Sequence, residues 1–168
     1  MKRALAWLLI GMVPVLVWGA DSNPDESFYK NAGEGGLAEV AAGKLAESKA
    51  SSTALKDFGG MMVKDHSTAD QKLWAAAAAR GVKMPTTPSV EQVAAGDRLK
   101  LLSGDSFDKA YIKNQLESHR DTVALLKKEM ASGRDKDARQ FAEATLPTVE
   151  AHLEKIMKIA SAAGVAAE

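Results

Sequence analysis

Cap and stop residues divide this chain into four long segments and one short segment, each with the composition of a helix. Residues 23–26 combine a cap residue, a proline and an early glutamate, which indicates the start of a first long helix that runs to about residue 50. Ser51 and Ser52 break that helix and cap a second one, which ends at residue 80 in front of Gly81. Aromatic residues make up only 5% and runs of β-branched residues are missing, so the composition favours helix over sheet.

The second half of the chain has boundaries of the same kind. Ser89 and Gln92 form a capping box, which opens a short helix that ends before Gly104. Asp105 or Ser106 is expected to cap a third long helix that stops at residue 133, and a fourth long helix spans about residues 135–163.

The lengths of the connections predict how these helices are arranged. Helices of about 25 to 28 residues are rods of roughly 40 Å, and tight turns join the first to the second and the third to the fourth. The connection between the second and third long helices has about 24 residues, which is long enough to return along such a rod. We therefore predict an all-α fold, a ferritin-like four-helix bundle with one long crossover that contains a short extra helix.

Residues 1–20 have the pattern of a signal peptide. Lys2 and Arg3 precede an uncharged apolar run, and the small residues Gly19 and Ala20 offer two cleavage positions. The run is too short to span a membrane, and the chain has no cysteine for a lipid anchor or a disulfide. We expect residues 21–168 to form one domain in the periplasm or outside the cell, without a transmembrane segment. An uncleaved N-terminal anchor is the alternative, and the sequence does not support association with the outer membrane.

Charge excludes two classes of partner. Without Lys2 and Arg3 the chain has 20 basic and 22 acidic residues, a net charge of about −2, and the basic residues are not concentrated on one segment. A nucleic acid or an anionic lipid surface requires a basic face. We therefore expect no nucleic-acid partner, while an envelope protein partner or a homo-oligomer stays open.

All three histidines of the chain lie where the helical apolar stripes would continue. The stripes can be drawn in steps of four and three residues without using histidine, and each stripe then has one gap. The gaps fall on His66 in the second long helix, His119 in the third and His152 in the fourth. The stripe residues are Leu55, Gly59, Met62, Ala69, Leu73 and Ala76, then Ile112, Leu116, Val123, Leu126 and Met130, then Thr145, Val149, Ile156, Ile159 and Ala163.

Glu39 in the first long helix is predicted to lie level with two of these histidines. Counting 1.5 Å per residue puts Glu39, His66 and His119 about 18 to 22 Å from the end of the bundle that holds the first turn, and His152 about 12 Å from it. One carboxylate and two or three imidazoles can therefore converge at mid-bundle. This is a ligand set for one ion of iron, manganese, copper or zinc.

Three neighbouring residues are candidates for auxiliary roles at that site. Met62 lies one turn before His66 and offers a thioether, which would favour copper. Asp65 and Tyr111 lie beside the stripes and are candidates to orient a histidine by a hydrogen bond.

A di-iron centre is not indicated. Ferritin-like di-iron proteins use Glu-x-x-His on two helices, whereas Val63, Leu116 and Val149 stand three residues before the histidines. Glu39 is the one well-placed carboxylate where four are needed. The pattern therefore favours a site for one ion.

The chain resembles the bacterial family called domain of unknown function 4142, whose members are exported and often labelled outer membrane proteins. The resemblance covers about residues 25–163 and implies a ferritin-like helical fold and a location in the cell envelope, but no established activity. The matching segments are Gly36-Leu37-Ala38-Glu39, Leu45-Ala46, Met62-Val63-Lys64-Asp65-His66, Ser103-Gly104, Phe107-Asp108-Lys109-Ala110-Tyr111, His119, Leu146-Pro147 and His152-Leu153.

Three functions remain open from the sequence. The first is an exported bundle that binds one metal ion or small ligand through Glu39, His66, His119 and His152. The second is a non-catalytic envelope or stress-associated bundle that acts through its surface, with the histidines as a polar layer that fixes helix register. The third is an oxidoreductase with a bound redox metal, and whether the chain is an enzyme at all stays undecided.

Overall fold

Residues 25–166 are described in a computed structural model, where they form five α-helices and no strand. The predicted all-α class is therefore confirmed, while the predicted signal peptide at residues 1–20 lies outside the described residues. Within residues 25–166, no helix combines the length and the apolar character that crossing a membrane requires. The helices are α1 (Glu26–Lys49), α2 (Thr53–Ala79), α3 (Val90–Lys100), α4 (Gly104–Ser132) and α5 (Lys136–Ala162).

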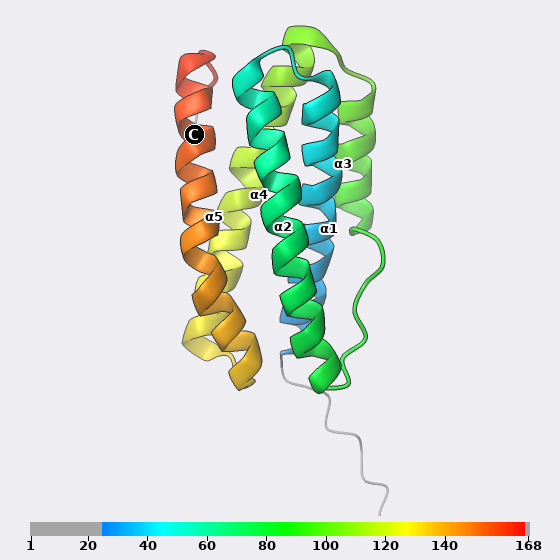
Figure 1. The fold of residues 1–168 in the computed structure, drawn as a ribbon, viewed down its shortest axis with the longest axis vertical. Helices are drawn as coiled ribbons and strands as arrows, with labels where there is room; N and C mark the ends of the chain where they lie inside the picture. Colours follow the sequence, from blue (N-terminus) through cyan, green and yellow to red (C-terminus); the bar gives the residue numbers. More distant parts are fainter. Residues whose placement is uncertain (1–24, 167–168) are drawn as a thin grey trace, which may run out of the picture.

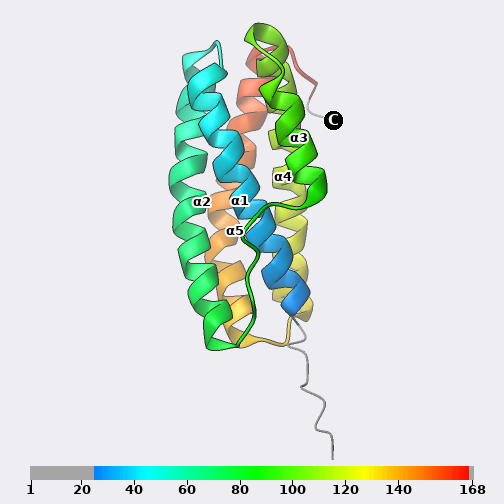
Figure 2. The ribbon, with the colours of Figure 1, turned by 90° about the vertical axis from the view of Figure 1, so that its right-hand side faces the viewer.

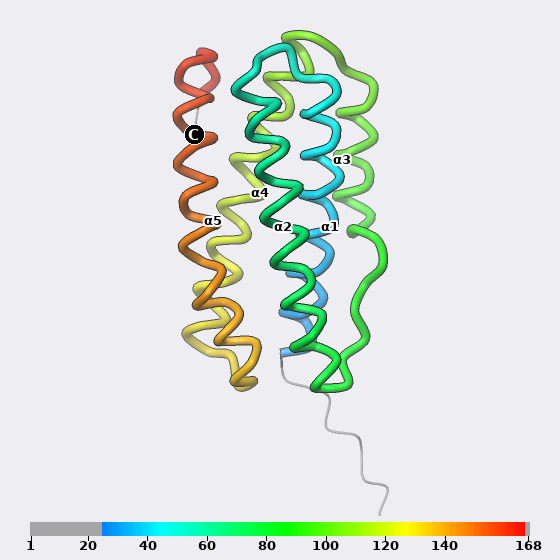
Figure 3. The backbone as a smooth tube through the Cα atoms, in the orientation of Figure 1, coloured from blue at the N-terminus to red at the C-terminus, as the bar shows by residue number. Residues whose placement is uncertain are grey.

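The four long helices lie side by side and form two antiparallel hairpins (Figure 1, Figure 3). Short turns join α1 to α2 and α4 to α5, and the helices of each hairpin pack closely along their length. The hairpins contact each other less extensively, through α1 with α4 and through α2 with α5. The space between the hairpins is therefore lined by all four long helices.

The connection between α2 and α4 returns along the length of the molecule. It leaves α2 at the end opposite the α1–α2 turn, runs beside α1 and contains α3 (Figure 2). α3 packs against α1 and α4. α2 and α4 consequently run in the same direction, as a long crossover requires.

Three of the predicted caps are present. The Ser52 hydroxyl accepts the N–H of Leu55 at 3.2 Å. Ser89 and Gln92 form the complete capping box of α3. The Asp135 carboxylate accepts the N–H groups at the start of α5. These local signals explain why the helix starts could be located from sequence.

The predicted caps of α1 and α4 were wrong by two or three residues. The N-cap of α1 is Asp25, and its side chain makes no cap hydrogen bond because it accepts the backbone N–H groups of Arg134 and Asp135. The N-cap of α4 is Ser103, two or three residues ahead of the expected Asp105 or Ser106. Gly104 has a φ of +58°, a conformation that glycine adopts without strain, so the chain can turn into the helix at this earlier position.

Two glycines set the close approach of α1 and α2. A Cβ atom on Gly43 would lie 2.7 Å from the carbonyl oxygen of Gly59, and a Cβ atom on Gly59 would lie 2.7 Å from that of Gly43. Real Cβ atoms do not come this close to a backbone oxygen. The α1–α2 hairpin therefore depends on the missing side chains at both positions.

The buried residues form two hydrophobic clusters with a polar layer between them. One cluster lies toward the α1–α2 turn and includes Phe58, Met62 and Ile156. The other lies toward the α4–α5 turn and includes Leu73 and Val149. On each long helix a polar residue separates the members of the two clusters, and these residues are Glu39, His66, His119 and His152.

Candidate metal centre

Each long helix contributes at least one buried polar side chain to the middle of the molecule. Glu39 comes from α1, His66 from α2, His119 from α4 and His152 from α5. All four are between 1% and 7% exposed, so water has little contact with them. Polar groups at this depth require partners, which makes their hydrogen bonds informative.

The three histidine rings form a nearly equilateral triangle. The ring centroids are 5.8 Å apart for His66 and His119, and 5.6 Å apart for each of the other two pairs. Each histidine has one ring nitrogen that belongs to a group of three, and these three nitrogens all lie within 4.8 Å of one another. The rings are tilted or edge-on to one another, so they do not stack as an aromatic pair would.

His152 belongs to this triangle, although its predicted height was about one turn too low. The height was counted on rods of about 40 Å, whereas α4 has 29 residues and is about 43 Å long, which accounts for about 3 Å of the difference. His152 lies about 24 Å along α5 from the α4–α5 turn, which leaves it about 19 Å from the other end. His66 is about 20 Å from that end, so the two are level.

Hydrogen bonds fix which nitrogen of two rings carries the proton. His119 Nδ1 lies 2.9 Å from the carbonyl oxygen of Gln115, which can only accept, so Nδ1 donates. His152 Nε2 lies 3.0 Å from Asp65 Oδ2 and donates to this carboxylate. In neutral rings, the opposite nitrogens are then acceptors with a free lone pair.

These acceptor nitrogens have no hydrogen-bond partner in the described part of the chain. They are Nε2 of His119 and Nδ1 of His152, and Nε2 of His66 is also buried and unpaired. Each of the three rings thus carries one buried nitrogen without a partner, and the three rings lie together in one buried cluster.

Burial keeps the rings of His66 and His152 neutral. It lowers the pKa of His66 to about 4, against a smaller opposing effect of Glu39. Burial also lowers the pKa of His152, although the hydrogen bond to Asp65 acts in the opposite direction. At neutral pH both rings are unprotonated, the state that a metal ligand must have.

Glu39 lies beside the triangle but is not part of it. Its Oε2 accepts from Gln115 Nε2 at 2.8 Å, and its Oε1 accepts from the Ser118 hydroxyl. Among the described residues, the ligand atoms that all lie within 4.8 Å of one another come from the three histidines. Of the four predicted ligands, the structure thus brings three together and holds the fourth against α4.

The carboxylate of Glu39 is nevertheless ionised. Burial acts to raise its pKa, but His119, His66 and the hydrogen bonds from Ser118 and Gln115 together lower it below the ordinary value. The polar layer therefore contains one negative charge next to the neutral imidazoles of His66 and His152.

The auxiliary residues behave differently from one another. Asp65 orients a histidine as predicted, because its carboxylate holds His152. Tyr111 does not, since its ring packs on Phe58 and Phe107 and its buried hydroxyl has no hydrogen-bond partner. Met62 is fully buried in the hydrophobic cluster next to the layer.

Ser118 and Phe58 were not predicted from the sequence. Ser118 holds Glu39, and the Phe58 ring lies 6.2 Å from the ring of His119 and 6.5 Å from that of His152. The available signal was spacing, since Phe58 precedes His66 by two helical turns and Ser118 follows Gln115 by three residues.

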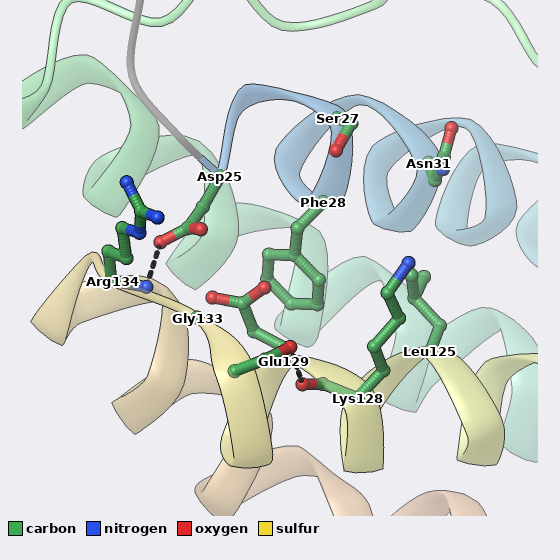
Figure 4. Close-up of a pocket in the computed structure, with 10 residues that line it drawn as sticks. Asp25, Ser27, Phe28, Asn31, Leu125, Lys128, Glu129, Gly133 and Arg134 are labelled. Atoms are coloured by element: carbon green, nitrogen blue, oxygen red, sulfur yellow. Dashed lines mark hydrogen bonds between the residues drawn. The ribbon is translucent and has the colours of Figure 1, made fainter.

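A second group of buried carboxyl groups lies where α1 begins (Figure 4). Asp25 accepts the N–H of Arg134 at 2.8 Å and thereby fastens the start of α1 to the α4–α5 turn. The Glu129 side chain packs over Gly133, and a side chain at position 133 would overlap the Oε1 atom of Glu129. Burial, followed by the charges of Asp25 and Asp135, raises the pKa of Glu129 to about 7. This group is separate from the histidines and has a structural role.

Comparisons with known proteins give one match. A family model described as "Domain of unknown function (DUF4142)" matches residues 19–159. Comparisons with curated proteins and with solved structures found no match. The family description assigns no activity, so the functional inference rests on the site itself.

Proposed function

This chain belongs to the DUF4142 family, and we propose that it is an exported, ferritin-like four-helix bundle that binds one transition-metal ion through His66, His119 and His152. The ion would be held by the three ring nitrogens that face one another. Glu39 supplies a negative charge beside the ion and stays hydrogen-bonded to α4.

The three unpaired ring nitrogens carry this proposal. A buried polar atom without a partner costs about 1 to 3 kcal/mol of folding free energy, and this layer contains three of them. A polar layer that only fixed helix register would pair its histidines with one another or with neighbouring groups. A single ion gives all three nitrogens a partner at once.

The charges of the layer suit a cation. The imidazoles of His66 and His152 are neutral and Glu39 is ionised, which partly offsets the cost of burying a divalent ion. The bonds from His119 to a carbonyl and from His152 to Asp65 are the outer contacts that typically orient metal-binding histidines.

The donor set favours some metals over others. Imidazole ligands suit zinc, copper and iron, whereas manganese prefers carboxylate oxygens. Three histidines without a carboxylate in the triangle therefore fit manganese least among the four metals considered. One ion is proposed, because a di-iron centre requires four carboxylates.

The ferritin-like assignment is supported by the α2–α4 connection, which returns along the length of the molecule (Figure 2). Export is supported by the signal-peptide pattern of residues 1–20.

Elemental analysis of the protein purified without a histidine tag tests the proposal. We expect about one equivalent of zinc, copper or iron, bound either on purification or after incubation with the ion. The double variant His66→Ala, His119→Ala should bind none, whereas Glu129→Gln, a change to a buried polar residue away from the layer, should bind as the wild type does. Absence of binding in the wild type with every ion would overturn the proposal.

A further inference from the structure

We propose that Asp65 is the ligand through which the metal ion exchanges between solvent and the three-histidine site, an inference that rests on the function proposed above. The side chain of Asp65 is 31% exposed, while that of His152, which it contacts, is 3% exposed. Asp65 is therefore a carboxylate that touches both water and the site.

The position of Asp65 supports this route. It lies on α2 next to α5, along one of the two less extensive contacts between the hairpins. On the α1–α4 side, the corresponding half-buried contact is the uncharged hydroxyl of Ser118, which is held by Glu39. A carboxylate attracts and binds a cation from water, whereas a hydroxyl does so weakly.

A second feature lies across the same seam. Lys155 Nζ on α5 rests 3.9 Å from the sulfur of Met61 on α2. Met61 lies one helical turn from Asp65, and Lys155 lies three residues after His152, so both belong to the surface where Asp65 emerges. At this point the seam is covered by a contact between two long, unbranched side chains, which have many accessible rotamers.

The hydrogen bond between Asp65 and His152 suggests how the ion passes inward. An arriving cation competes with the His152 N–H for the carboxylate of Asp65. When the ion binds the carboxylate, the imidazole is released and can turn about its terminal torsion toward the ion. The ion then moves to the triangle, and the hydrogen bond forms again.

Rates of Zn²⁺ binding and release separate this role from simple orientation of His152. Stopped-flow association and chelator-induced release would be measured for the wild type, Asp65→Asn, Asp65→Glu and the control Asp57→Asn. The asparagine side chain is isosteric with aspartate and keeps an acceptor for His152, but it lacks the charge. Asp57 is an exposed carboxylate on the same helix, so Asp57→Asn reproduces the charge change alone.

We expect Asp65→Asn to slow both association and release about tenfold and to leave the equilibrium affinity within about threefold. Asp65→Glu should restore the rates, and Asp57→Asn should not change them. Unchanged association with faster release in Asp65→Asn would mean that Asp65 only orients His152, and the inference would be wrong. Equilibrium titration of the wild type distinguishes this outcome from failure of the proposed function, in which no Zn²⁺ binds at all.

If Asp65→Asn does not fold, as judged by its circular dichroism, Asp65→Ser provides a second neutral variant. Slowed rates in Asp65→Ser support the route, and unchanged association contradicts it.

Discussion

His66 on α2 and His152 on α5 face each other across the two hairpins, with their ring centroids 5.6 Å apart. His119 on α4 completes the triangle at similar distances. The two hairpins contact each other less extensively than the two helices within each hairpin contact one another. An ion bound by these three rings would therefore link the two hairpins.

Metal binding should therefore stabilise the folded protein. Zn²⁺ at a free concentration of 100 times its Kd should raise the free energy of unfolding by about 2.7 kcal/mol, and a chelator should reverse the gain. The melting temperature of His119→Ala should not respond to Zn²⁺, whereas that of Glu129→Gln should respond as the wild type does. An equal increase in His119→Ala would place the bound ion elsewhere.

The metal-free protein should lose stability in acid through His66. Its pKa is about 4 in the folded state and about 6.5 when unfolded, so the unfolded state binds more protons between these values. The neutral His66 ring contributes on the order of 2 to 3 kcal/mol to the free energy of unfolding. This contribution is present above pH 6.5 and is lost as the pH falls to about 4. Chemical denaturation at several pH values, compared with His66→Gln, measures it. The same acid dependence in both proteins would contradict the assignment.

Glu129 should have the opposite effect. Its pKa is raised from 4.5 to about 7 in the folded state, so the folded protein holds the proton more tightly. Protonated Glu129 therefore contributes to the free energy of unfolding. This contribution is fully present below pH 4.5 and is lost as the pH rises to 7. Glu129→Gln mimics the neutral acid, and its free energy of unfolding should fall less than that of the wild type over this range. Parallel pH profiles would show that Glu129 is ionised throughout.

The close contact of α1 with α2 can be tested with two matched substitutions. Gly43→Ala should lower the free energy of unfolding by about 1 to 3 kcal/mol, because the new Cβ atom would meet the carbonyl of Gly59. Gly35→Ala, in the same helix, adds a Cβ atom in open space and should raise the free energy of unfolding by about 0.5 to 1 kcal/mol. Urea denaturation of both variants checks this, and equal effects would contradict the predicted contact.

The helices could be predicted from sequence because their boundaries are local. Ser52, Ser89 and Asp135 each bond a backbone N–H two or three residues away, and this spacing is visible in the sequence. Asp25 could not be read in this way, since its partners are more than 100 residues away in the α4–α5 turn.

The apolar stripes were predicted correctly near the histidines and less well toward the helix ends. On α2 the buried positions after His66 are Asp70, Leu73 and Ala77, so the pattern was right at Leu73 and one residue early at Ala69 and Ala76. A stripe drawn in alternating steps of four and three residues has a period of 3.5 residues. A straight helix has 3.6 residues per turn, so its buried face moves gradually away from such a stripe along the helix.

Buried acids were the second source of error. On α4, Glu129 is buried and the predicted Met130 is 36% exposed. Composition and periodicity treat a glutamate as a surface residue. Its burial follows from the glycine beneath it and from its long-range neighbours, which only the folded structure brings together.

X-ray absorption of the protein loaded with one equivalent of Zn²⁺ would show which side chains hold the ion. We expect three imidazole nitrogens at about 2.0 to 2.1 Å, together with the outer-shell scattering of three imidazole rings. In His119→Ala the ion, and with it this outer-shell signal, should be lost. A shell of oxygen ligands without imidazole scattering, or a spectrum unchanged in His119→Ala, would contradict a site built from His66, His119 and His152.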